Sequence, residues 1–113
     1  KVLVHTRADA GAVVFCGDLK ASVKAPNVTV MDTTGAGDGF FAGLTSGIIR
    51  TTIKDEGELT PAGIMRAIDR WDERQWRLIL DLGCHVGSSV CTEFGATTAL
   101  PNDRDMPWQG MGF

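Results

Sequence analysis

The chain has 113 residues, of which 43% are hydrophobic and 22% are charged, with a formal net charge of −3 and an isoelectric point near 5.2. Lysine and arginine are scattered rather than clustered, which argues against a nucleic-acid partner, and no apolar run approaches the roughly 18 residues of a membrane-spanning helix. Cys16, Cys84 and Cys91 show neither a Cys-x-x-Cys nor a zinc-type spacing. We therefore expect reduced thiols and a cytoplasmic protein that binds neither nucleic acid nor membrane.

The sequence predicts β-strands in the first third of the chain. Gly17-Asp18 predicts a tight turn between two of them. Short runs with the β-branched and apolar character of strands occupy Val2–His5, Ala12–Cys16, Ala21–Lys24 and Val28–Met31. We expect the last run to be a short buried strand that leads into the first helix.

The sequence predicts mainly helices in the rest of the chain. The spacing of Phe40, Leu44 and Ile48 predicts a helix from about Gly37 to Arg50. Within it, Gly43 and Gly47 form a Gly-x-x-x-Gly pair, which we expect to pack closely on the sheet.

Thr60-Pro61 predicts the start of another helix, with threonine as the N-cap and proline at the first helical position. The charged stretch 69–77 predicts a solvated face. The tryptophans indicate packing rather than base stacking, since no basic groove accompanies them. The apolar positions at helical spacing are Ile64, Ile68, Trp71, Leu78, Leu82, Val86 and Val90.

The segment from Asp32 to Phe40 joins the expected strand to the first helix through glycines and carries the chemistry. At a helix start the first N–H groups lack intrahelical partners and the dipole is positive, so a phosphate is favoured there. Gly35 and Gly37 allow a close approach and positive φ angles that aim several N–H groups at one point. Asp38, a carboxylate in the first turn, is placed to take a proton from a hydroxyl that attacks this phosphate.

Two common glycine loops are excluded by spacing. A Walker A loop needs a lysine directly after its glycines, and the next lysine here is Lys54. A dinucleotide-binding fingerprint needs the spacing Gly-x-Gly-x-x-Gly, whereas these glycines fall at positions 35, 37, 39 and 43.

The string Asp-Thr-Thr-Gly-Ala-Gly-Asp-x-Phe instead resembles the C-terminal signature of the ribokinase-like (PfkB-type) family of sugar and nucleoside kinases. The residues 2–4 and 8–14 are similar to the family's strand, turn and strand ahead of this signature. The residues 83–86, with Cys91 and 95–96, are similar to its adenine-side helix and following loop, with a spacing like that of ketohexokinases and fructokinases.

The resemblance implies an α/β fold, a ribokinase-like three-layer α/β/α sandwich. Since family members are several times longer, we expect residues 1–113 to be the C-terminal nucleotide-binding and catalytic part of such a kinase domain, inactive by itself. The implied reaction is ATP-dependent phosphorylation of a sugar hydroxyl of the ketohexose (fructose) or ribose class, with magnesium. A homodimer is expected for the full-length enzyme.

The implied roles are specific. Asp38 would be the general base, and the backbone of Gly35, Ala36, Gly37 and Asp38 would form an anion hole for the transferring phosphoryl group. The nucleotide would be lined by Ala8, Asp9, Gly11, Gly35, Gly37, Phe40 and Cys84. His85 could also touch adenine, whereas Cys84 and Cys91 could equally be core thiols. A monovalent cation, potassium, would be held by Asp32 with the carbonyls of Thr34, Val90, Glu93 and Gly95.

Several alternatives stay open. The alternative role of Asp32 is to tether the loop. The acceptor could be a nucleoside or another small alcohol. A non-catalytic relative that only binds nucleotide is the third alternative, although such a site gains nothing from the carboxylate of Asp38 beside the phosphate.

Overall fold

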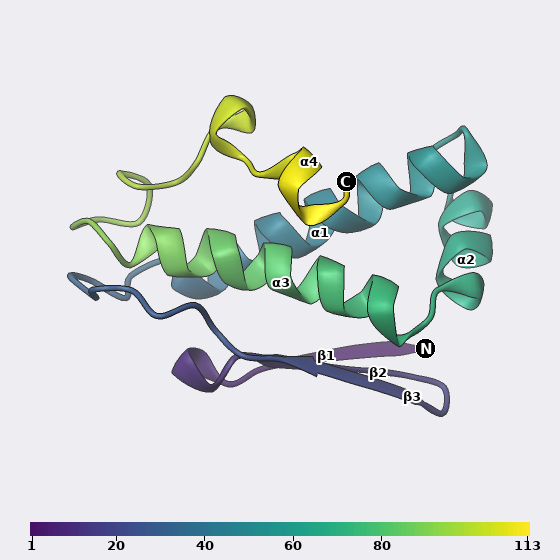
Figure 1. Ribbon diagram of the computed structural model, residues 1–113, viewed down its shortest axis with the longest axis horizontal. Coiled ribbons are helices and arrows are strands. Elements are labelled where there is room, and N and C mark those ends of the chain that lie inside the picture. The colour runs from purple at the N-terminus through teal and green to yellow at the C-terminus, as the bar shows by residue number, and fades with distance from the viewer.

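The computed structural model describes all 113 residues as a small antiparallel sheet with helices stacked on one of its faces (Figure 1). The sheet has the order β1-β2-β3, formed by Val2–Thr6, Ala12–Cys16 and Leu19–Val23. Val14 of the central strand lies opposite Val4 on one side and Ala21 on the other. The turn at Gly17-Asp18 is confirmed, and the third strand begins two residues earlier than expected.

Four α-helices follow the sheet. Helix α3, Glu73–Val90, lies on the sheet, and the long helix α1, Ala36–Glu56, runs along α3 (Figure 1). The short helices α2, Pro61–Arg70, and α4, Trp108–Met111, lie at the end of α1 and beside α1 and α3 respectively. Two single turns of 3-10 helix, Ala8–Ala10 and Asp103–Asp105, complete the structure. None of these helices combines the length and the apolar character that crossing a bilayer requires.

The core lies between the inner face of the sheet, α3 and the facing side of α1. Trp71 and Trp76, inside the charged stretch 69–77, pack edge to face with ring centroids 5.2 Å apart, so the tryptophans serve packing as expected. The charged residues of this stretch surround the corner between α2 and α3. The buried cluster comprises Ala12, Val14, Ala21, Phe40, Leu44, Ala67, Trp71, Trp76, Ile79, Leu80 and Cys84.

The expected strand at Val28–Met31 was wrong. This segment is extended but pairs with no strand, and the side chains of Val28, Val30 and Met31 are 37%, 57% and 49% exposed. Its β-branched residues favour an extended backbone, but a strand also needs a neighbour, and here only the Met31 and Asp32 N–H groups donate, both to the Cys91 carbonyl.

Helix α1 extends six residues beyond the expected end at Arg50. Its last turns bury Thr51 and Thr52 rather than aliphatic side chains, so the apolar periodicity that predicted the helix stops before the helix does. Gly57 then ends it, and its N–H donates to the Ile53 carbonyl. The start of α2 is confirmed, since the Thr60 hydroxyl accepts from the Gly63 N–H at 3.0 Å.

Gly39, Gly43 and Gly47 of α1 face α3 and not the sheet, which corrects the expectation for Gly43 and Gly47. A Cβ added at Gly43 would lie 2.7 Å from the Leu82 carbonyl oxygen, and one at Gly83 would lie 2.9 Å from the Phe40 ring. Similar contacts surround Gly39 and Gly87. Glycine on both helices therefore lets the two backbones approach more closely than side chains would permit.

This contact predicts that Gly43→Val destabilises the chain by about 2–3 kcal/mol, because the new side chain must push α1 away from α3. The free energy of unfolding in urea measures the effect. Gly110→Val is the matched control, since a Cβ at Gly110 has no atom within 4 Å. Equal stability of the two variants would show that the helices do not need this approach.

Candidate nucleotide-binding groove

Asp32 ties the start of α1 to the loop that follows α3. Its Oδ1 atom accepts hydrogen bonds from the Thr34 N–H at 3.0 Å and from the Thr34 hydroxyl at 2.7 Å. Its Oδ2 atom accepts from the Gly95 N–H at 2.9 Å, across 63 residues of sequence. The carboxylate thus acts as a clamp between two loops, which is the tethering role that the sequence had left as an alternative.

The same three donors lower the pKa of Asp32 below its ordinary value of 3.8. The Gly95 N–H contributes most, followed by the N–H and the hydroxyl of Thr34, whereas desolvation opposes them weakly. Donors aimed at a carboxylate favour its ionised form. Asp32 is therefore ionised at neutral pH, and its carboxylate is stabilised by hydrogen bonds from Thr34 and Gly95.

The clamp positions Gly35, which is the N-cap of α1 and has a φ of 80°. A side chain there would be strained, and its Cβ would lie 2.8 Å from the Cβ of Ala96 in the clamped loop. The positive φ expected at Gly37 was wrong, because Gly37 already lies in the helix. A Cβ at Gly37 would meet no atom within 4 Å, so the space in front of it is open.

The first turn of α1 offers unused donors at this open space. The Ala36 N–H donates to the Thr33 carbonyl at 3.2 Å and the Gly39 N–H donates to the Gly35 carbonyl at 2.9 Å. The N–H groups of Gly37 and Asp38 have no acceptor in the protein. At the positive end of a 21-residue helix, these two groups form a site for an anion.

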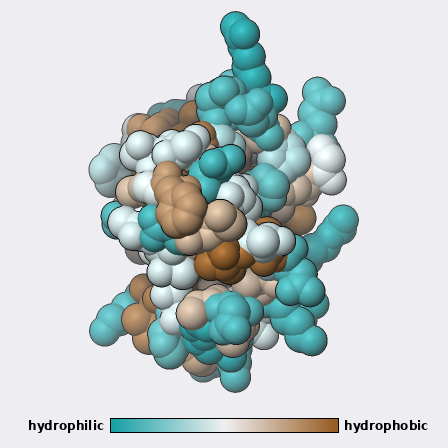
Figure 2. Space-filling view, turned by 90° about the vertical axis from the view of Figure 1, so that its left-hand side faces the viewer, coloured by the Kyte–Doolittle hydropathy of each residue, from teal (hydrophilic) through white to brown (hydrophobic).

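A groove with a volume of about 890 Å³ runs from this helix start across the end of the molecule. Figure 2 faces that end and shows hydrophobic side chains gathered among paler and hydrophilic ones. Among the residues expected to line a nucleotide, the groove brings together Ala8, Asp9, Gly11, Gly37, Phe40 and Cys84. Gly35 and Asp38 do not line it, and Asp38 is exposed beside Gly37.

The turn between β1 and β2 forms one wall of the groove. Gly11 has a φ of 92°, and a Cβ there would lie 1.9 Å from the Val23 carbonyl oxygen, so this position accepts only glycine. Ala8 also has a positive φ, 51°, which is unusual for a residue with a side chain. The strained turn is thus packed against the end of β3 and fixed in place.

Sequence reasoning missed two other parts of the wall. Ala25, Pro26, Asn27, Val28 and Val30 belong to the extended segment after β3, and nothing in their sequence signals a site. Gly87 and Ser88 near the end of α3 also line the groove, together with Cys91, which the family resemblance had already assigned to the adenine side. Their positions three, four and seven residues after Cys84 on one helical face could have identified them.

Cys84 and Cys91 are both buried, as core thiols would be, and both also border the groove. Burial, and secondarily the charge of Asp81, raises the pKa of the Cys84 thiol to about 11. It is a neutral, apolar group at neutral pH. His85 does not line the groove, and all three cysteines are free thiols, as expected.

The residues expected to hold a monovalent cation are only partly gathered. Asp32, Thr34 and Gly95 are joined by the clamp, Val90 is the last residue of α3, and Glu93 lies exposed in the loop between them. Both Asp32 oxygens already accept hydrogen bonds in this arrangement. No group of three or more histidine, cysteine, aspartate or glutamate side chains comes together, here or elsewhere in the chain.

Comparison with known proteins places this geometry in context. The model of the pfkB family carbohydrate kinases matches residues 1–103. Fructokinase of Escherichia coli is 33% identical over 105 residues, which cover 93% of this chain and 29% of that protein. The chain therefore spans less than a third of the length of this relative.

Solved structures give the same result. The fructokinase of Vibrio cholerae O395 with bound fructose, ADP and calcium has a TM-score of 0.58 and 28% identity, over 91% of this chain and 28% of that one. A double mutant of that enzyme binds fructose, ADP and potassium. The aminoimidazole riboside kinase of Salmonella enterica, with aminoimidazole riboside and an ATP analogue, has a TM-score of 0.59 and 28% identity, over 88% and 28% of the two chains.

The clamp predicts a pH-dependent stability. The pKa of Asp32 is lower in the folded chain than in the unfolded one, so its stabilisation is fully present above about pH 4 and is lost as the pH falls through the lowered pKa. Asp32→Ala should lower the melting temperature at pH 7, and its difference from the wild type should shrink in acid. Asp69→Ala, on the exposed side of α2, is the control. A difference that is absent at pH 7, or undiminished in acid, would contradict the clamp.

Proposed function

The chain belongs to the pfkB family of carbohydrate kinases, and we propose that it forms the nucleotide-binding and catalytic-base part of an ATP-dependent sugar kinase. The observation that carries the proposal is the first turn of α1. There, Gly37 lines the open groove with its N–H group unused, and Asp38 stands beside it with a second unused N–H group and an exposed carboxylate.

In this proposal the nucleotide lies along the groove. Its base lies towards Cys84 and the apolar wall of the extended segment, and its phosphates reach the start of α1. The helix dipole and the free N–H groups stabilise the charge on the transferring phosphoryl group, and such preorganised donors are each worth about 3–4 kcal/mol of barrier. Clamping by Asp32 keeps these donors in place before substrate arrives, so little reorganisation accompanies the reaction.

Asp38 is the general base. It accepts the proton of the acceptor hydroxyl as this oxygen attacks the phosphoryl group. Asp38 is outside the groove lining while its neighbour Gly37 is inside it, so the acceptor approaches from the exposed side of the helix and the nucleotide from the other. This arrangement separates the two substrates and brings them together at one helical turn.

The acceptor we propose is a ketohexose of the fructose class, supported by the fructokinases among the relatives. A nucleoside acceptor is the second candidate, supported by the similarity to aminoimidazole riboside kinase. Phosphorylation assays with fructose, ribose and a purine nucleoside, on the full-length protein that contains this chain, distinguish them. Nucleotide binding without phosphorylation of any acceptor would favour a non-catalytic relative.

Magnesium would be held chiefly by the nucleotide phosphates, as is usual for this ion in phosphoryl transfer, and would neutralise their charge. Potassium, bound in a fructokinase relative, is the candidate for the loop that Asp32 clamps to Gly95. We further propose a cytoplasmic location, supported by three free thiols, and a homodimer for the full-length enzyme.

Gly37→Val tests the groove. The new side chain has free space around it in the protein, so the fold should be retained, but it would occupy the place of a phosphate. We expect ADP affinity, measured by NMR titration of the 113-residue chain, to fall about tenfold or more. Gly110→Val should leave ADP affinity unchanged. A Gly37→Val chain that binds ADP like the wild type would show that phosphate does not lie there.

Asp38→Asn tests the base. In the full-length protein, turnover should fall about 10²- to 10⁴-fold, while nucleotide affinity stays near that of the wild type or tightens because a negative charge is removed. Steady-state kinetics and ADP titration measure the two effects, with Asp69→Asn as the control. Turnover within about tenfold of wild type would exclude Asp38 as the base.

A further inference from the structure

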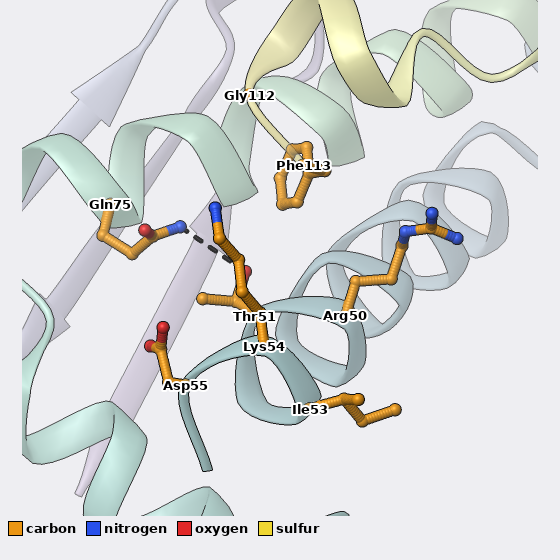
Figure 3. A pocket seen from close by; sticks show the side chains of 8 residues that line it. All are labelled: Arg50, Thr51, Ile53, Lys54, Asp55, Gln75, Gly112 and Phe113. Carbon is orange, nitrogen blue, oxygen red and sulfur yellow. Dashed lines mark hydrogen bonds between the residues drawn. The ribbon is translucent and has the colours of Figure 1, made fainter. Parts of the chain in front are cut away.

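A second cavity lies at the opposite end of α1 from the groove, about 360 Å³ in volume. It is bounded by the last turns of α1, the first turn of α3 and the residues that follow α4 (Figure 3). Its size is at the lower end of the range for small-molecule sites. Arg50, Thr51, Ile53, Lys54, Asp55, Gln75, Gly112 and Phe113 line it.

The polar groups of this cavity are arranged around one unpaired cation. Lys54 has no carboxylate within 4 Å, and its side chain runs between the Gln75 amide and the Phe113 ring (Figure 3). The Gln75 amide nitrogen donates to the hydroxyl of Thr51 at 3.5 Å, and Thr51 is only 4% exposed. An ammonium group and an amide donor thus face the same space.

The other charged residues of the cavity are already engaged. The Arg50 guanidinium lies 4.1 Å from the centroid of the Trp108 ring and 3.7 Å from an Asp103 oxygen, and it points away from Lys54 (Figure 3). Asp55 accepts from the indole N–H of Trp71 at 3.0 Å. The indole is neutral, so Asp55 keeps its negative charge. Lys54 is the one cation of the lining that has no carboxylate within 4 Å.

The apolar part of the lining is aromatic and aliphatic. The Phe113 ring packs edge to face against the Trp108 ring, with the ring centroids 6.0 Å apart. The backbone N–H of Phe113 donates to the Trp108 carbonyl at 2.7 Å, so the Phe113 ring is held over the cavity. Ile53 is 47% exposed at its edge. A ligand here would meet one cation, one amide donor and an aromatic wall.

From this combination we propose that the cavity binds a small monocarboxylate with an apolar or aromatic body. The carboxylate pairs with the Lys54 ammonium and accepts from the Gln75 amide, and the body rests against Phe113. A single unpaired cation, in a lining that also holds the Asp55 carboxylate, matches a monoanion better than a doubly charged phosphate. The site lies away from the signature loop and does not rest on the proposed kinase function.

Benzoate is the probe for this site, titrated into the ¹⁵N-labelled 113-residue chain and followed by NMR. We expect saturable shifts of the Lys54, Gln75 and Gly112 amides, with a dissociation constant of about 1–10 mM. Lys54→Gln should weaken binding about tenfold, because it removes the charge and keeps a polar side chain. Lys24→Gln, beyond the end of β3, is the matched control and should bind benzoate like the wild type.

Phe113→Ala should also weaken benzoate binding, which tests the aromatic wall separately from the charge. Inorganic phosphate, titrated in parallel, should bind more weakly than benzoate. The proposal is overturned if these amides do not saturate, if Lys54→Gln and Lys24→Gln behave alike, or if phosphate binds more tightly than benzoate.

Discussion

The backbone contact between α1 and α3 is the constraint on which the rest of the structure depends. Glycines at 39 and 43 on one helix face glycines at 83 and 87 on the other, with contacts that leave no room for a Cβ. The close approach brings the start of α1 to the end of α3, and α3 in turn lies on the sheet. The helical walls of the groove are therefore positioned by this one packing.

Two shorter-range contacts convert that packing into a site. The Asp32 carboxylate joins the start of α1 to the loop after α3, and Gly11 brings the turn between β1 and β2 against the end of β3. Each contact fixes a backbone segment: the Asp32 carboxylate holds the Gly95 N–H, and Gly11 lies against the Val23 carbonyl. As a result, the donors at the helix start point into a preformed space, which is how a protein favours an anion without a dedicated cationic residue.

Long helix α1 also links two different environments. Its first turn presents glycine and unused N–H groups to a wide groove, and its last turns present threonine, lysine and aspartate to a narrower cavity. The two sites differ in the source of their positive charge, which is the backbone dipole in the groove and a lysine side chain in the cavity.

Much of this chain could be predicted from sequence, because the relevant signals are local. The β2–β3 hairpin, the Thr60-Pro61 helix start and the family follow from turn chemistry, capping and a motif of nine residues. Six of the seven residues that the family resemblance named for the nucleotide line one groove. The errors at Val28–Met31, at the end of α1 and at Gly43 share a cause. Each depends on which segment lies opposite, and propensity and periodicity carry no information about that neighbour.

The sequence alone determined the chemistry of the loop at residues 32–40, since glycine, a free helix start and an aspartate are local properties. Only the tertiary structure decided that Asp32 is a clamp, that α1 packs on α3, and that the extended segment and the end of α3 complete the groove. The clamp alone joins residues 63 positions apart. Such contacts depend on backbone distances set by packing, which no short stretch of sequence specifies.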